Sequence, residues 1–138
     1  LLPAAAMADG GGESVEQPLV VTQATARVML VDDEAPVRAT TAEMLAELGY
    51  LVIEAASGEE AIERIAHESV DLLITDHLMG GMTGMALIDR LRTERPALPT
   101  LIVTGYADTS GLAADVPRLT KPFRRVELSA MLETLRRV

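Results

Sequence analysis

The sequence predicts an α/β domain in which a parallel sheet lies between two layers of helices. Three short apolar runs support this prediction, at residues 27–31, 70–75 and 101–103. Each run is bounded by polar or turn-forming residues, as is typical of strands that are buried on both faces. Segments with helical periodicity separate the runs, and this alternation favours parallel strands joined by helices.

The first half of the domain is predicted to contain strands at residues 27–31 and 50–55, each followed by a helix. The first helix begins near Pro36, because proline is tolerated in a first helical turn, and it stops at Gly49. The second begins after Ser57, which forms a predicted capping box with Glu60. Apolar residues recur at helical spacing in both segments.

The second half adds strands at residues 70–76, 101–104 and 118–120, and helices at 85–95 and 126–138. Prolines 96 and 99 stop the first of these helices. Only Leu112 suggests an apolar stripe between Gly105 and Arg118, so we expect the fourth helix there to be short or irregular. The complete alternation predicts five parallel strands in the flavodoxin-like order 2-1-3-4-5, with helices on both faces.

Composition sets limits on the possible functions. The 138 residues suffice for one domain, and 49% hydrophobic with 24% charged residues is a globular composition. A net charge of −9 argues against direct nucleic-acid binding, and the absence of cysteine excludes disulfides and thiolate metal sites. The absence of cysteine also fits a cytoplasmic location. No apolar run approaches the roughly 20 residues needed to span a bilayer, so we expect a soluble segment without membrane contact.

Polar residues follow three of the predicted strands. Asp32 and Asp33 follow the first, Asp76 ends the third and Thr104 ends the fourth. Ligands of open α/β sheets bind at this carboxyl edge, although a single aspartate there is equally compatible with a turn or a helix cap. Clustered carboxylates repel one another unless a cation lies among them, and hard oxygen ligands favour Mg²⁺.

In these features the chain resembles the receiver domains of two-component response regulators. The resemblance covers about residues 26–138 and depends on four motifs in the order of the family. These are the pair Asp32-Asp33, the stretch from Asp76 through Met79 to Gly84, the pair Thr104-Gly105 with Tyr106 after it, and Lys121-Pro122-Phe123.

The resemblance implies that Asp76 accepts a phosphoryl group from a phosphohistidine. It implies that Mg²⁺ is held by Asp33, Asp32, Asp76 and the backbone carbonyl of Leu78. By itself, such a domain accepts the phosphoryl group and hydrolyses it slowly. The implied partner is a sensor histidine kinase or a histidine phosphotransfer protein.

The remaining motif residues carry auxiliary roles in the resemblance. Thr104 would donate its hydroxyl to a phosphoryl oxygen, and Lys121 would pair with Asp76 and then with the phosphate. Tyr106 would act with Thr104 as a conformational switch. A cis peptide bond before Pro122 would direct the lysine.

The chain departs from the family in two places. Gly80 stands where the family usually has proline and is followed by Gly81, so we expect a more mobile acceptor loop. The second departure is the reduced fourth helix, which in the family contributes to the surface used for dimerisation and output. A version without most of this helix is not expected to dimerise in the usual way.

Residues 1–25 are predicted to be a flexible linker or the end of a preceding domain. Gly10-Gly11-Gly12 is typical of a linker, and residues 1–5 are similar to the last strand of the ATP-binding domain of sensor histidine kinases. The parent chain is therefore either a hybrid histidine kinase or a stand-alone regulator.

Two other functions compete with this interpretation. A phosphatase of the haloacid dehalogenase type also uses a strand-end aspartate and Mg²⁺, but it needs a second acid two residues later, where this chain has Leu78. A pseudo-receiver would keep the fold as a protein-binding module without being phosphorylated. The presence of all the motif residues argues against it.

Overall fold

The computed structural model describes residues 26–105 and 111–136. Five parallel strands form one sheet in the order β2-β1-β3-β4-β5, which confirms the predicted topology. The strands are β1 (Arg27–Val31), β2 (Leu51–Ala55), β3 (Leu72–Asp76), β4 (Thr100–Thr104) and β5 (Arg118–Thr120). These bounds differ from the predicted ones by one or two residues at most.

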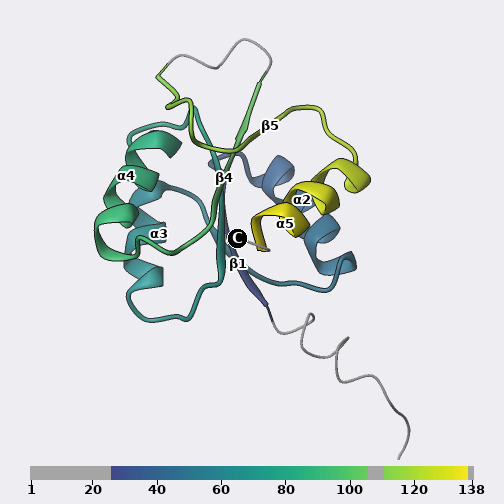
Figure 1. The fold of residues 1–138 in the computed structure, drawn as a ribbon, viewed down its shortest axis with the longest axis horizontal. Coiled ribbons are helices and arrows are strands. Elements are labelled where there is room, and N and C mark those ends of the chain that lie inside the picture. Colours follow the sequence, from purple (N-terminus) through teal and green to yellow (C-terminus); the bar gives the residue numbers. More distant parts are fainter. Residues whose placement is uncertain (1–25, 106–110, 137–138) are drawn as a thin grey trace, which may run out of the picture.

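Four helices cover the sheet within the described residues. They are α2 (Ala35–Glu47), α3 (Gly58–Ile65), α4 (Gly84–Glu94) and α5 (Arg125–Arg136). Figure 1 shows α3 and α4 on one face of the sheet and α2 and α5 on the other. None of these helices has the length and apolar content required to cross a bilayer.

The helices begin where the sequence predicts. The hydroxyl of Ser57 accepts a hydrogen bond from the backbone N–H of Glu60 at 3.0 Å, and the Glu60 carboxylate accepts one from the N–H of Ala56 at 2.8 Å. These two bonds satisfy backbone donors that a helix start leaves without an intrahelical partner. Pro36 lies in the first turn of α2.

The sheet is buried on both faces because alternate residues of its central strands enter different apolar clusters. Met29 and Val31 pack with residues of α3 and α4, whereas Val28 and Leu30 pack with residues of α2 and α5. All four are buried. This explains the uninterrupted apolar run of β1, since each side chain faces a helix layer.

The connection from β4 to β5 lacks a helix in its described part, residues 111–117, in agreement with the predicted reduction. Val116 lies in the same apolar cluster as α3 and α4 and is 3% exposed. Two side-chain contacts help to hold this turn segment on the fold. The Arg92 guanidinium of α4 lies 3.6 Å from the Asp115 carboxylate, and Arg118 donates to the Ala113 carbonyl at 2.6 Å.

Candidate functional site

Four strands place polar residues at the carboxyl edge of the sheet. Asp32 follows β1, Asp76 ends β3, Thr104 ends β4 and Lys121 follows β5. The parallel register pairs Asp76 with Val103 and Thr104 with Thr120. The strand ends are therefore level, and the side chains that follow them meet in one place.

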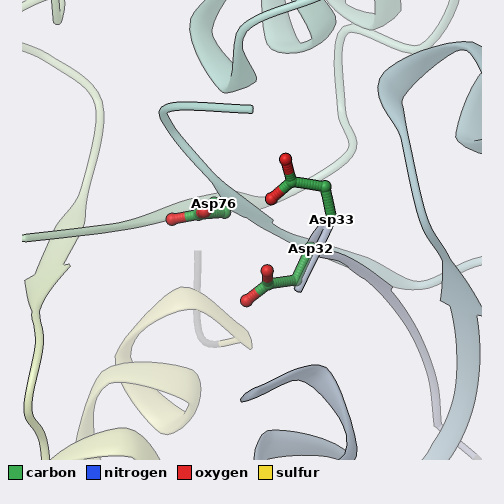
Figure 2. A group of neighbouring side chains, drawn as sticks. All are labelled: Asp32, Asp33 and Asp76. Atoms are coloured by element: carbon green, nitrogen blue, oxygen red, sulfur yellow. The ribbon is translucent and has the colours of Figure 1, made fainter. Parts of the chain in front are cut away.

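Asp32, Asp33 and Asp76 form a compact carboxylate cluster. Each contributes one oxygen, and these oxygens all lie within 4.8 Å of one another. Figure 2 shows the three side chains beside one another, with Asp76 at the end of β3 and Asp32 and Asp33 just after β1. Asp32 is buried, Asp76 half-buried and Asp33 exposed, so the cluster is open to solvent on one side. A set of carboxylate oxygens with one open side fits a hard divalent cation such as Mg²⁺.

Among residues 26–105 and 111–136, Lys121 is the cation that faces the cluster. Its Nζ lies 3.3 Å from Oδ1 of Asp76 and 3.7 Å from Oδ2 of Asp32. Its backbone N–H donates to the Thr104 carbonyl at 2.8 Å, and the Lys121–Pro122 peptide bond is cis. One positive charge therefore faces two of the three acids.

The pKa of Asp76 is raised above its ordinary value of 3.8, chiefly because burial penalises the charged carboxylate. Lys121 lowers this pKa through its positive charge and its hydrogen bond, and the carboxylate of Asp32 raises it. Burial and the Asp32 carboxylate together raise the pKa of Asp76 by more than Lys121 lowers it, so the site disfavours the ionised form of Asp76. Additional positive charge near the carboxylate would stabilise the ionised form.

The backbone of Asp32 is held by Arg38, which sequence analysis did not identify. Its guanidinium donates to the Asp32 carbonyl at 2.7 Å and to the Glu54 carboxylate at 2.9 Å. The Asp32 carboxylate also accepts from the backbone N–H of Glu34 at 2.9 Å. An arginine in the first half of an amphipathic helix is usually solvated, so residue type alone gave no signal for these contacts.

The loop after Asp76 is closed by Gly84. Its N–H donates to the His77 carbonyl at 2.8 Å, and a Cβ at this position would overlap the carbonyl oxygen of Asp76. Within this loop, the backbone N–H of Gly80 donates to Oδ2 of Asp33 at 3.1 Å. The loop thus connects β3 to the acid pair after β1.

The other predicted residues occupy different surroundings. Thr104 is 1% exposed, and its hydroxyl donates to the Gly105 carbonyl at 3.3 Å. Leu78 lies in the loop after β3 with 51% of its surface exposed. Tyr106, the predicted switch residue, lies outside the described residues.

A comparison with known protein families identifies the chain. The profile of the response regulator receiver domain matches residues 28–133. The chain belongs to this family. Its role is therefore that of a phosphoacceptor domain in two-component signalling.

Several curated proteins contain a similar receiver domain. The sensor kinase CckA of Brucella abortus is 37% identical over 119 residues, which cover 80% of this chain and 12% of that protein. The two-component response regulator PhoP of Pseudomonas aeruginosa is 34% identical over 116 residues, or 80% of this chain and 52% of that protein. The DNA-binding transcriptional regulator NtrC of Escherichia coli is 31% identical over 111 residues, or 77% of this chain and 24% of that protein. The receiver domain thus corresponds to about half or less of each of these relatives.

Solved structures of similar size give the same fold. The response regulator TrrA of Thermotoga maritima, in complex with Mg²⁺-BeF, has a TM-score of 0.74 and 29% identity, covering 80% of this chain and 99% of that chain. The receiver domain of the hybrid histidine kinase CckA has a TM-score of 0.66 and 32% identity, covering 80% and 98% respectively.

Proposed function

We propose that Asp76 is the phosphoacceptor and that Mg²⁺ binds beside it to Asp32, Asp33 and Asp76. The convergence of these three carboxylates within 4.8 Å, with Lys121 at 3.3 Å from Asp76, is the observation that carries the proposal. The backbone carbonyl of Leu78 is the proposed fourth protein ligand. The complex of the similar TrrA with Mg²⁺-BeF supports a metal site of this kind.

In the proposed reaction an oxygen of Asp76 attacks the phosphorus of a phosphohistidine on a partner protein. The new P–O bond forms as the P–N bond breaks, and the bonding pair remains on the imidazole nitrogen, which takes up a proton. Phosphoryl transfer depends mainly on positioning and on neutralisation of charge. Mg²⁺, when bound, supplies part of that neutralisation at the phosphoryl oxygens.

Lys121 and Thr104 are proposed to bind the transferred group. Lys121 already contacts Asp76, so its ammonium can move to a phosphoryl oxygen without leaving the site. Thr104 ends the neighbouring strand, and we propose that its hydroxyl turns from the Gly105 carbonyl to a phosphoryl oxygen. Tyr106 is proposed to respond to that movement.

The proposed phosphodonor is a sensor histidine kinase or a histidine phosphotransfer protein. Receiver domains of this family occur both in the hybrid kinase CckA and in response regulators such as PhoP, and both kinds of parent protein are compatible with this chain. We propose residues 26–138 as the receiver domain and residues 1–25 as a linker or the end of a preceding domain.

Intact-mass spectrometry tests the proposal directly. The chain is incubated with acetyl phosphate or phosphoramidate in Mg²⁺ or in EDTA, beside the variant Asp76→Asn. We expect one added phosphoryl group, only in Mg²⁺ and only in the wild type. A folded protein that gains no phosphoryl group in Mg²⁺ would instead act as a pseudo-receiver, and a gain that persists in the variant would refute the assignment of Asp76.

A further inference from the structure

Asp33 is the exposed member of the carboxylate cluster, and one hydrogen bond orients it. Its Oδ2 accepts from the backbone N–H of Gly80 at 3.1 Å. Within residues 26–105 and 111–136, no ion pair reaches Asp33, whereas Asp32 and Asp76 both lie near Lys121. An exposed carboxylate without such a partner samples several rotamers, so this hydrogen bond determines where the Asp33 oxygens lie.

The donor exists because position 80 is not proline. Proline, which receiver domains usually carry here, has no backbone N–H and could not make this bond. The donor is also fixed in space, because the same loop is anchored at Gly84, which packs against the Asp76 carbonyl and donates to His77. The hydrogen bond therefore joins the loop after β3 to the acid pair after β1.

We propose that the backbone N–H of Gly80 is a positioning group that tightens divalent-cation binding by holding Asp33 toward Asp32 and Asp76. The inference rests on the metal site of the proposed function. A carboxylate oxygen has two lone pairs, so Oδ2 can accept from Gly80 while the carboxylate still faces a cation. Donors that orient a ligating carboxylate typically change metal affinity 10–100-fold when removed.

Two substitutions at position 80 separate the N–H from the other properties of glycine. Gly80→Ala keeps the donor, and it fits because no atom lies within 4 Å of the added Cβ and the backbone is outside the left-handed region. Gly80→Pro removes the donor. Replacing the Gly80 amide by an ester, with glycolic acid at this position, removes the N–H without introducing the proline ring.

Mg²⁺ affinity is measured by isothermal titration calorimetry, with thermal unfolding in EDTA as the control for folding. We expect Gly80→Ala to bind Mg²⁺ within about twofold of the wild type, and Gly80→Pro and the ester to bind on the order of tenfold more weakly. In EDTA the melting temperatures of the three variants should stay close to that of the wild type, because the side chain of Asp33 is exposed and its position contributes little to folding.

The outcomes distinguish this inference from the proposed function. If the wild type binds Mg²⁺ and is phosphorylated but the ester binds equally well, the role of Gly80 is wrong and the proposed function stands. If Gly80→Ala is weakened as much as Gly80→Pro, glycine flexibility is the cause and the inference fails. If the wild type binds no Mg²⁺, both the metal site and this inference fail.

Discussion

Substitution of Asp76 by asparagine should stabilise the protein in the absence of a divalent cation. With an effective dielectric constant of about 20, the Lys121–Asp76 pair at 3.3 Å corresponds to an attraction of about 5 kcal/mol. The carboxylates of Asp32 and Asp33, with oxygens within 4.8 Å, oppose it by at least about 3.5 kcal/mol each. The repulsion therefore offsets the attraction of the lysine, and the burial of Asp76, which is the largest cause of its raised pKa, makes its charge unfavourable overall.

Solvent screening weakens the repulsion from Asp33, because Asp33 is exposed. We expect Asp76→Asn to raise the free energy of unfolding by about 1–2 kcal/mol in EDTA, or the melting temperature by about 3–8 °C. Lys121 keeps a partner in the variant, since Asp32 lies 3.7 Å away. Urea unfolding at pH 8 and low salt measures the difference.

The stability difference between Asp76→Asn and the wild type should also depend on pH. Because folding raises the pKa of Asp76, the folded protein is penalised when this group is ionised, and the penalty is complete above the folded-state pKa. It disappears as the pH falls through that pKa toward the ordinary value of 3.8. The advantage of the variant should therefore be largest at pH 7–8 and shrink as the pH falls toward 4.

The control is Asp89→Asn, which removes the same charge from an exposed position on α4. It should leave stability within about 0.5 kcal/mol. Added Mg²⁺ should stabilise the wild type by about 1.4 kcal/mol at ten times its dissociation constant, and should do much less for Asp76→Asn. A variant that is no more stable than the wild type in EDTA, or an advantage that persists unchanged at pH 4, would refute the electrostatic reasoning.

Three further substitutions test the supports of the site. Gly84→Ala should destabilise the fold by at least about 2 kcal/mol in urea unfolding, because its Cβ would overlap the Asp76 carbonyl; equal stability would show that the loop can shift freely. Arg38→Ala should lower the free energy of unfolding by about 1–2 kcal/mol and slow phosphorylation by acetyl phosphate, because the Asp32 carbonyl loses its donor. Arg38→Lys should restore part of the stability and part of the rate. An unchanged rate in Arg38→Ala would limit Arg38 to a structural role. Ser57→Ala should lower the free energy of unfolding by about 1 kcal/mol through loss of the α3 cap, and it should leave the rate of phosphorylation unchanged. A change in that rate would contradict a purely local role of Ser57.

The fold could be predicted because strong local patterns and the parallel topology agree. The apolar run that follows Arg27 is too short for a typical helix, so it predicted a strand between two helix layers, and every residue from Val28 to Val31 is buried in the structure. The sequence did not reveal which residues face which layer, because both faces are apolar. Only the structure assigns Met29 and Val31 to the layer of α3 and α4.

The site could be predicted where it depends on side chains at strand ends. The acids after β1 and β3 and the lysine after β5 have recognisable residue types, and the topology brings them together. The contacts of Gly80 and of Asp32 involve a backbone N–H, which every residue except proline has, and a backbone carbonyl, which every residue has. Such contacts leave no pattern in the sequence. The greater mobility expected of the Gly80-Gly81 loop stays a prediction.

The charges of the cluster explain why the domain should respond to phosphorylation rather than merely accept it. A phosphoryl group adds about 1.5–2 negative charges at neutral pH and would replace the single charge of Asp76. Lys121 is shared between Asp76 and Asp32, and its backbone is bonded to Thr104 at the end of β4. Any movement of its ammonium toward a phosphoryl oxygen would therefore weaken its contact with Asp32, so the arrival of the phosphoryl group would change the charge balance of the acid pair after β1.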